Sequence, residues 1–442
     1  MLYFWTMANH IKSEEEILKK LKIAKLNPMQ KEAGTAIKSS RNTILLSPTG
    51  TGKTLAFLLP LLEDLDPEVF NVQAMILVPS RELAIQIEQV IREMGTGFKA
   101  NAVYGGRSSA KDRLELKHPP AIIIGTPGRL ADHLRRETFS SEAIKIIILD
   151  EFDKSLEIGF KEEMSEIFDL LPAIEKRILT SATQNVEIPG FVGMKDPKKV
   201  NYLSEEVTLL KVKTVNSTNK DKLDSLINLL AHIGNKPGII FCNFKDSIQF
   251  VSDFLSENNI PHGTFHGGME QQDRERALIK FRNGTHRIII ATDLAARGID
   301  IPALNFIIHY QLPLKEAEFT HRNGRTARME EKGTAYVLKW EKEQLPEFIE
   351  ESFIQSLESN SIKKETEWKT LFISGGRKDK ISKGDIAGLF FKQGNLNKDE
   401  LGTIELKQDC SFVSVVSSKA QEVIKTLDNS RLKKKKVRIR LV

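Results

Sequence analysis

Short apolar runs rich in β-branched residues alternate with longer amphipathic stretches along most of the chain. A buried strand followed by a helix that covers it produces this alternation, so the pattern predicts repeated βα units on parallel sheets. The predicted strands of a first α/β domain are Thr43–Leu46, Met75–Val78, Ile122–Ile124, Ile146–Leu149 and Ile178–Leu179. Those of a second α/β domain are Gly238–Phe241, Arg287–Ala291, Phe306–His309 and Ala335–Leu338.

The domain boundaries follow from where this pattern stops. We expect the first domain at residues 1–205 and the second at 221–362, with the polar, weakly periodic segment 206–220 as a linker. Residues 366–442 show the order strand-helix-strand-strand-helix-strand, which is that of ferredoxin-like RNA-recognition folds. The elements of this α+β domain are predicted at Thr370–Ile373, Lys383–Phe391, Gly402–Leu406, Ser411–Val416, Ala420–Leu427 and Val437–Leu441.

Charge is unevenly distributed between these domains. The whole chain carries a net charge of +6, whereas the residues from Thr366 onward hold 17 Lys and Arg against 9 Asp and Glu, a net +8. A basic module attached to a nearly neutral body favours a nucleic-acid partner, and a solvated basic tail is the alternative. No apolar run approaches the ~20 residues of a membrane span. With two distant cysteines, Cys242 and Cys410, a reducing cytoplasmic location is expected.

A phosphate-binding loop is predicted where the first strand ends. The sequence Ser47-Pro48-Thr49-Gly50-Thr51-Gly52-Lys53-Thr54 lies between a strand and a helical run. Glycines let the loop turn its N–H groups toward phosphate oxygens, and the helix N-terminus adds partial positive charge. We therefore expect Thr49 to Thr54 to bind a nucleotide, with Lys53 at the β- and γ-phosphates and the Thr54 hydroxyl on Mg²⁺.

An acidic cluster, Asp150-Glu151-Phe152-Asp153, follows the strand Ile146–Leu149. Carboxylates at the carboxyl end of a parallel strand lie at the ligand-binding edge of the sheet. Asp150 is a candidate Mg²⁺ ligand, and Glu151 is a candidate to orient and deprotonate the attacking water.

These motifs, and others in the same order, resemble those of DEAD-box RNA helicases of superfamily 2. The further matching segments are Asn27–Gln30, Pro79–Ala84, Gly105-Gly106, Thr126–Arg129, Ser181–Thr183, Phe241–Asn243, Gln271 with Arg274, Thr292-Asp293, Ala296–Asp300 and His321–Arg328. Three positions depart from the family pattern: Phe152 replaces Ala, Asn323 replaces Ile and Ala327 replaces Gly. None of these changes removes a charge.

The resemblance implies two tandem RecA-like domains that close over ATP, Mg²⁺ and single-stranded RNA. It implies that Gln30 reads adenine beside an upstream aromatic, Phe4 or Trp5, and that Asp300 binds the ribose. Arg325 and Arg328 would stabilise charge on the γ-phosphoryl group after closure. Coupling residues would be Asp153, Ser181, Thr183 and His321. The implied RNA contacts are Arg81, Gly106, Thr126, Arg129, Arg274, Thr292 and Arg297.

The C-terminal domain resembles the RNA-binding domain of the DbpA subfamily in the segments Ser374–Lys378 and Gly384–Ile386. That resemblance implies anchoring to a hairpin of 23S ribosomal RNA during assembly of the large ribosomal subunit. We expect a monomer with no DNA or membrane partner. Arg377, Lys378 and Arg438 are candidate RNA contacts. Only Phe372 and Phe412 supply aromatic rings to the sheet, so Phe412 is either part of a stacking platform or a core residue. An ATP-gated RNA clamp, a general RNA chaperone and a DNA translocase are the alternatives.

Overall fold

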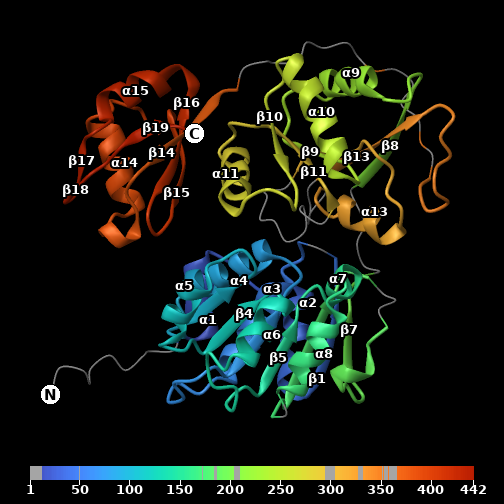
Figure 1. Cartoon of the computed structure of the whole chain (residues 1–442), viewed down its shortest axis with the longest axis vertical. Helices are drawn as coiled ribbons and strands as arrows, with labels where there is room; N and C mark the ends of the chain where they lie inside the picture. Colours follow the sequence, from blue (N-terminus) through green and yellow to red (C-terminus); the bar gives the residue numbers. More distant parts are fainter. Residues whose placement is uncertain are drawn as a thin grey trace. The chain divides into compact units, whose positions relative to one another are not determined.

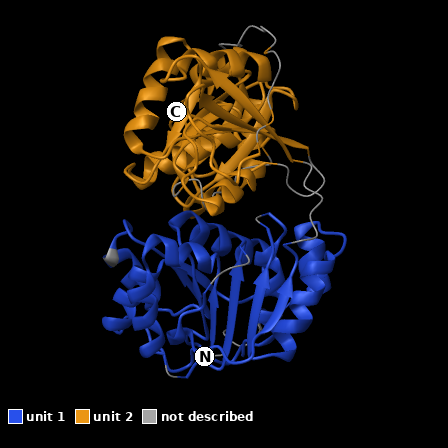
Figure 2. Cartoon of the chain, turned by 90° about the vertical axis from the view of Figure 1, so that its right-hand side faces the viewer, with its two compact units in different colours: residues 1–208, 297–300 blue, residues 209–296, 301–442 orange. Residues whose placement is uncertain are grey.

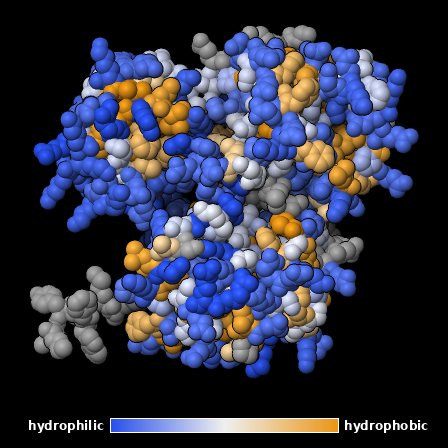
Figure 3. All heavy atoms as spheres, in the orientation of Figure 1, coloured by the Kyte–Doolittle hydropathy of each residue, from blue (hydrophilic) through white to orange (hydrophobic). Residues whose placement is uncertain are grey.

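The computed structural model describes residues 12–48, 50–171, 173–183, 187–203, 210–293, 304–326, 332–350, 352, 357 and 366–442. The chain divides into two compact units, residues 1–208 with 297–300 and residues 209–296 with 301–442 (Figure 2). None of the described helices is long and apolar enough to cross a membrane. Apolar side chains on the face shown in Figure 3 lie in small groups among hydrophilic ones.

The first unit holds a seven-stranded parallel sheet with the strand order β3-β4-β2-β5-β6-β1-β7 (Figure 1). The strands are β1 (Asn42–Leu46), β2 (Ala74–Leu77), β3 (Ala100–Val103), β4 (Ile122–Gly125), β5 (Ile146–Leu149), β6 (Lys176–Ser181) and β7 (Lys198–Asn201). The helices are α1 (Glu14–Leu21), α2 (Pro28–Ser39), α3 (Lys53–Glu63), α4 (Arg81–Met94), α5 (Ser109–Leu116), α6 (Pro127–Arg135), α7 (Phe152–Ile158) and α8 (Lys161–Asp169). All five predicted strands are confirmed, while β3 and β7 were missed.

Strand periodicity divides the core of this unit into two layers. Successive residues of β2 enter different apolar clusters: Ile76 packs with α3 and α4 on one face, and Met75 and Leu77 pack with α6 and α8 on the other. Side chains of successive strand residues point to opposite faces, so the sheet is covered by helices on both sides.

The second α/β domain contains a six-stranded parallel sheet with the order β10-β11-β9-β12-β13-β8. Its strands are β8 (Leu210–Ser217), β9 (Gly238–Phe241), β10 (His262–Phe265), β11 (Ile288–Ala291), β12 (Phe306–His309) and β13 (Gly333–Trp340). Its described helices are α9 (Leu223–Ile233), α10 (Lys245–Glu257), α11 (Gln271–Arg282) and α13 (Glu316–Asn323). The four predicted strands are confirmed, and the fold class of two parallel-sheet domains is as expected.

The predicted linker is wrong for residues 210–217. These residues form β8, which pairs along its whole length with β13 at the edge of the second sheet. Lys211 and Lys213 interrupt the apolar pattern of this strand. An edge strand tolerates such lysines, and they made it resemble a polar connection.

The C-terminal domain has the predicted ferredoxin-like topology, with an antiparallel sheet of order β15-β16-β14-β19. Its elements are β14 (Trp368–Ile373), α14 (Lys383–Lys392), β15 (Leu401–Leu406), β16 (Ser411–Val416), α15 (Ala420–Leu427) and β19 (Ile439–Leu441). A short hairpin, β17 (Arg431–Leu432) and β18 (Lys435–Lys436), precedes the last strand. Leu371, Val413 and Ile439 pack under the two helices in a separate apolar core.

The other face of this sheet contacts the second α/β domain through the turn that follows α11. Two nitrogens of the Arg282 guanidinium group, Nε and Nη2, donate hydrogen bonds to the Glu405 carboxylate at 2.7 and 2.8 Å. The Ser414 hydroxyl donates to the Asn283 carbonyl oxygen at 2.8 Å. The Thr285 and Thr370 hydroxyls are 2.7 Å apart, and both hydroxyl contacts are buried. The two domains of the second unit are therefore joined by buried, directional polar contacts.

We expect the Arg282–Glu405 pair to control this docking. Cysteines introduced at Thr285 and Thr370 should form a disulfide readily, because the two hydroxyls they replace are in contact. Glu405→Arg should slow disulfide formation by about tenfold, since two guanidinium groups then face each other. Adding Arg282→Glu should restore the rate by re-forming the pair with reversed polarity. Equal rates in all three proteins would contradict this docking.

Candidate nucleotide and RNA site

The carboxyl edge of the first sheet carries nearly all the candidate residues of the first domain. Parallel strands all end at this edge, so the strand order decides which loops are neighbours. Strands β5, β6 and β1 are consecutive in the sheet, and the acidic cluster, Ser181 and the phosphate loop lie at their respective carboxyl ends. Strands β3, β4 and β2 are also consecutive, and they are followed by Gly106, Thr126 and Arg81. The predicted nucleotide residues and the predicted RNA residues thus occupy separate halves of one edge.

The phosphate loop is tightly turned around the ammonium group of Lys53. Gly50 and Gly52 have φ angles of 89° and 88°, a left-handed conformation that side chains other than glycine rarely adopt. The Lys53 Nζ donates to the Ser47 carbonyl at 2.5 Å and to the Pro48 carbonyl at 2.7 Å. A phosphate oxygen is a stronger acceptor for an ammonium group than a neutral carbonyl. Lys53 is therefore already positioned inside a loop suited to phosphate, while Thr49 lies outside the described residues.

Gln30 is brought to this loop by the start of α2. Its Oε1 accepts from the Asn27 N–H at 3.0 Å, and its Nε2 donates to the Gly52 carbonyl at 3.2 Å. Asn27 in turn donates to the Thr51 carbonyl at 3.0 Å. The structure thus gives Gln30 a contact with the phosphate loop that sequence reasoning did not foresee. Its role with adenine stays a prediction, and residues 1–11, with Phe4 and Trp5, lie outside the described part of the chain.

The acidic cluster is buried where β5 ends. Asp150 is 3% exposed, and its Oδ1 accepts from the Thr180 hydroxyl and from the Glu151 N–H. Burial and the adjacent Glu151 raise the pKa of Asp150 to about 6. The Glu151 Oε2 is buried without a hydrogen-bond partner among the described residues. Clustered carboxylate and hydroxyl oxygens fit Mg²⁺, for which Thr54 and Asp150 remain the candidates.

The Phe152 side chain turns away from these carboxylates. It is 1% exposed and packs with Met164 and Ile167 in the apolar cluster under α8. The larger side chain therefore fills core space and does not enter the acidic site.

The predicted coupling residues of the first domain are adjacent. The Ser181 hydroxyl oxygen accepts from the Thr183 N–H at 3.0 Å, and the Thr183 hydroxyl lies 3.4 Å from Asp153 Oδ2. Asp153 and the fully buried Lys154 ammonium are 3.7 Å apart. The acidic cluster and the end of β6 therefore form one polar assembly.

Arg81 and Gly106, both predicted RNA contacts, lie against each other. A Cβ added to Gly106 would meet Arg81 Nη1 at 2.8 Å, and the φ of Gly106 is +84°. Thr126 directly precedes α6, at its N-cap position, and is 9% exposed. The absence of a side chain at Gly106 is what gives the Arg81 guanidinium its position.

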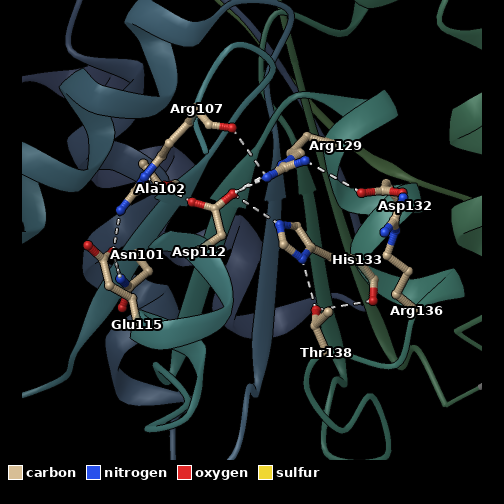
Figure 4. A network of polar contacts seen from close by, with 10 residues as sticks. All are labelled: Asn101, Ala102, Arg107, Asp112, Glu115, Arg129, Asp132, His133, Arg136 and Thr138. Carbon is tan, nitrogen blue, oxygen red and sulfur yellow. Dashed lines mark hydrogen bonds and ion pairs between the residues drawn. The ribbon is translucent and has the colours of Figure 1, made fainter. Parts of the chain in front are cut away.

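Arg129 belongs to a buried ion network that sequence reasoning missed (Figure 4). The Asp112 carboxylate is fully buried and contacts Arg129 Nη2 at 2.6 Å, Arg107 Nε at 2.9 Å and His133 Nε2 at 3.2 Å. Burial opposes ionisation of Asp112, but these hydrogen bonds and the two guanidinium groups outweigh it and lower its pKa. The network fixes Arg129 beside Thr126. Nothing in the charged sequence of α5 distinguishes Asp112 from a surface residue.

Arg322 plays the corresponding part in the second domain. Its side chain is fully buried, and it bonds both Asp293 carboxylate oxygens, at 2.7 and 2.5 Å. It also donates to Asn243 Oδ1 at 2.7 Å and to the Gln311 carbonyl at 2.8 Å. One guanidinium group therefore connects the loops that follow β9, β11 and β12. Sequence reasoning had given Arg322 no role.

The remaining candidates of the second domain are placed unevenly. His321 and Arg325 are buried at the end of α13, and Thr292 directly precedes Asp293. Arg274 is 6% exposed, with its guanidinium carbon 4.8 Å from the centroid of the Phe265 ring. Arg297, Asp300 and Arg328 lie outside the described residues.

The basic candidates of the C-terminal domain lie on its surface. Lys378 and Arg438 have side chains that are 56% and 70% exposed, and each contacts an aspartate, Asp409 at 2.6 Å and Asp428 at 3.1 Å. Arg377 begins the adjacent turn of 3-10 helix. Exposed pairs of this kind are weak, so both cations are free to exchange their partners for phosphate oxygens.

The sequence matches three families in the predicted order. They are the DEAD/DEAH box helicases over residues 27–189, the helicase conserved C-terminal domain over residues 221–330 and the DbpA RNA binding domain over residues 370–441. The chain is 32% identical over 431 residues to ATP-dependent RNA helicase DbpA of Escherichia coli strain K12, covering 94% of each protein. It is 32% identical to ATP-dependent RNA helicase DbpA of Bacillus subtilis strain 168, covering 90% of this chain and 91% of that one.

Solved helicase structures share the fold of the two α/β domains. S. cerevisiae Dbp5 bound to RNA and ADP BeF3 is 30% identical, with a TM-score of 0.67 over 75% of this chain and 89% of that chain. Mss116p bound to single-stranded RNA and AMP-PNP is 25% identical, with a TM-score of 0.66 over 75% of this chain and 73% of that chain.

We expect Asp112 to be essential to the stability of the first domain. Asp112→Asn keeps the side-chain size but removes the buried anion that Arg107, Arg129 and His133 share, which should cost about 3 kcal/mol of unfolding free energy. Glu175→Gln is the matched control, because its side chain and that of its partner Lys145 are 58% and 62% exposed and such a pair contributes under about 1 kcal/mol. Urea unfolding followed by circular dichroism measures both. Similar losses in the two variants would show that the network does not depend on Asp112.

Proposed function

The chain belongs to the DEAD-box ATP-dependent RNA helicases of the DbpA type, and from this membership we propose that it separates short duplexes of 23S ribosomal RNA during large-subunit assembly. ATP is the substrate that it hydrolyses, and Mg²⁺ is the cofactor. We propose that it works as a monomer in the cytoplasm, where its two free thiols, Cys242 and Cys410, stay reduced.

The observation that carries the proposal is the division of the first sheet edge into a nucleotide half and an RNA half. Lys53 and the loop N–H groups bind the phosphates, and Glu151 orients the attacking water. Thr54 and Asp150 would hold Mg²⁺, which would supply positive charge to the phosphate oxygens. The polar assembly of Asp153, Thr183 and Ser181 lies beside the nucleotide half and is suited to couple it to RNA.

The second domain completes the reaction by supplying arginines. Charge builds on the γ-phosphoryl oxygens during transfer, and an arginine delivered from outside accelerates such reactions by about 10³–10⁵. Arg325 and Arg328 are the proposed arginines, Asp300 is the proposed ribose contact and His321 is a coupling residue. RNA bound by both domains, through residues such as Arg81 and Arg274, favours the arrangement in which hydrolysis proceeds.

The C-terminal domain is proposed to select the RNA on which the enzyme acts. Its net charge of +8 supports binding to phosphates. Arg377, Lys378 and Arg438 are proposed to hold a ribosomal RNA hairpin through its backbone. The helicase domains would then act on duplexes within reach of that anchor.

We expect hydrolysis to depend on Lys53 and Glu151 in different ways. Lys53→Ala should weaken ATP binding and abolish turnover, whereas Glu151→Gln should keep ATP binding and lower kcat at least about 100-fold, because only the water-orienting carboxylate is lost. Glu162→Gln, at an exposed position of α8, is the control. RNA-stimulated phosphate release and fluorescent-ATP binding measure the two steps. Turnover near the control value in Glu151→Gln would refute its assignment.

We expect RNA targeting to be lost when the basic surface of the C-terminal domain is reversed. The variant Arg377→Glu/Lys378→Glu/Arg438→Glu should bind the ribosomal RNA hairpin more than about tenfold less tightly, because phosphate contacts become repulsions. Its ATPase activity at saturating unrelated RNA should stay near the wild-type value. Deletion of residues 366–442 should have the same effect on hairpin preference. Preference that survives both changes would end the targeting proposal, and tight binding without strand displacement would indicate an RNA clamp.

A further inference from the structure

A cavity of about 590 Å³ opens beside β10, the edge strand of the second helicase sheet. Its walls come from α10, β10 and α11 of the helicase domain and from Val442 of the C-terminal domain. The Val442 N–H donates to the Thr370 carbonyl at 3.1 Å, so this wall is continuous with the C-terminal sheet. The volume lies within the range of small-ligand sites, roughly 300–1,000 Å³, and is large enough for a nucleotide.

Cations dominate the charge around this cavity. Arg276 and Lys280 line it from successive turns of α11. The pKa of Lys280 is lowered by burial, and further by Arg276 and by Lys369 of β14. Asp273 also lines the cavity, but its side chain is 57% exposed and it contacts Arg276 at 3.5 Å. A lysine whose pKa is lowered by neighbouring cations has an electrostatic preference for an anionic ligand.

His286 adds a polar group that is not satisfied within the protein. It lines the cavity, and its Nδ1 is buried without a hydrogen-bond partner among the described residues. Burial, then Lys280, lowers the pKa of His286 to about 4, so the ring is neutral at physiological pH. A neutral imidazole offers one donor and one acceptor, which suits a hydroxyl group.

An aromatic ring lies on β14 opposite Arg440, two residues before Val442 of the cavity wall. Phe372 lies on the same sheet face as Thr370 and Arg440, and the Arg440 guanidinium carbon is 5.1 Å from the centroid of its ring. Phe372 also contacts Phe412 edge-on, with centroids 5.7 Å apart. Phe412 is 5% exposed, whereas Phe372 is only partly buried. The part of the sheet face that the helicase domain leaves accessible therefore carries a ring flanked by a guanidinium group, which is the chemistry that stacks RNA bases.

We propose that the cavity beside β10 binds a phosphodiester of single-stranded RNA through Arg276 and Lys280, while a neighbouring base stacks on Phe372. We call this the strand site. It rests on the proposed function, because the RNA that it binds is the single-stranded extension of the hairpin anchored by the C-terminal domain. His286 contacts the 2′-hydroxyl. The site guides the strand from the anchor onto the second helicase domain, and it is formed only while the two domains of that unit are docked.

The test compares a hairpin RNA that has a single-stranded extension with the same hairpin lacking it, both bound to the full-length chain. The wild-type protein should bind the extended RNA about tenfold more tightly and with a steeper salt dependence, by about 0.7 in log–log slope for each added phosphate contact. Arg276→Met/Lys280→Met, which keeps the aliphatic stems, should remove both differences and leave binding of the plain hairpin unchanged. Phe372→Leu should reduce the affinity difference without changing the salt slope.

Lys236→Met/Lys392→Met removes two charges at exposed positions away from the cavity and should behave as wild type. The strand site is overturned if the extension adds no affinity in the wild-type protein. It is also overturned if Arg276→Met/Lys280→Met weakens binding of both RNAs equally. The same holds if the control variant loses the extra affinity that the extension provides. Failure of the proposed function is distinguishable, because the plain hairpin would then bind no better than an unrelated hairpin, whatever happens at α11.

Discussion

Parallel pairing of β5, β6 and β1 is the constraint on which the chemistry of the first domain depends. The register aligns Leu149 with Leu179 and Leu46 with Ser181, so the three strands end within two residues of one another at one edge of the sheet. Thr180 can then reach across to Asp150, and the Ser47 N–H continues the ladder to the Ser181 carbonyl at 3.1 Å. A slip of one residue would turn every side chain to the opposite face. The catalytic geometry is therefore set by backbone register before any side chain contributes.

A second constraint acts on the C-terminal sheet, because its open face both docks on the second α/β domain and carries part of the proposed RNA surface. Glu405, Ser414 and Thr370 point from the open face and bond the last residue of α11 and the turn after it. A face that docks on protein needs polar groups matched to that partner, which accounts for the small number of aromatic residues on it. RNA binding by this domain is then left to its exposed basic loops and to the accessible strip around Phe372. Docking and recognition are thus divided between parts of a single sheet.

Sequence patterns predicted the features that depend on local chemistry. The buried central strands, the phosphate loop and the carboxylates after β5 each carry a signal within a few residues, and the structure places them as expected. β3, β7, β8 and β10 were missed because edge strands are short or half exposed and lack a continuous apolar run. Asp112 and Arg322 were missed for a different reason. Their partners lie far away in sequence, so nothing local marks a charged side chain that the fold will bury.

Two departures from the family pattern, Asn323 and Phe152, are accommodated by contacts with residues that are distant in sequence. Asn323, where the family resemblance predicts Ile, has its Oδ1 3.1 Å from Nε2 of the buried His309. The His309 ring is also packed against Phe319, with ring centroids 5.0 Å apart, and burial beside Arg322 lowers its pKa to about 3. A buried neutral imidazole needs a hydrogen-bond partner, and an isoleucine at position 323 would offer none. Asn323 and His309 therefore have to be interpreted as a pair, as Phe152 has to be interpreted with the core that receives it.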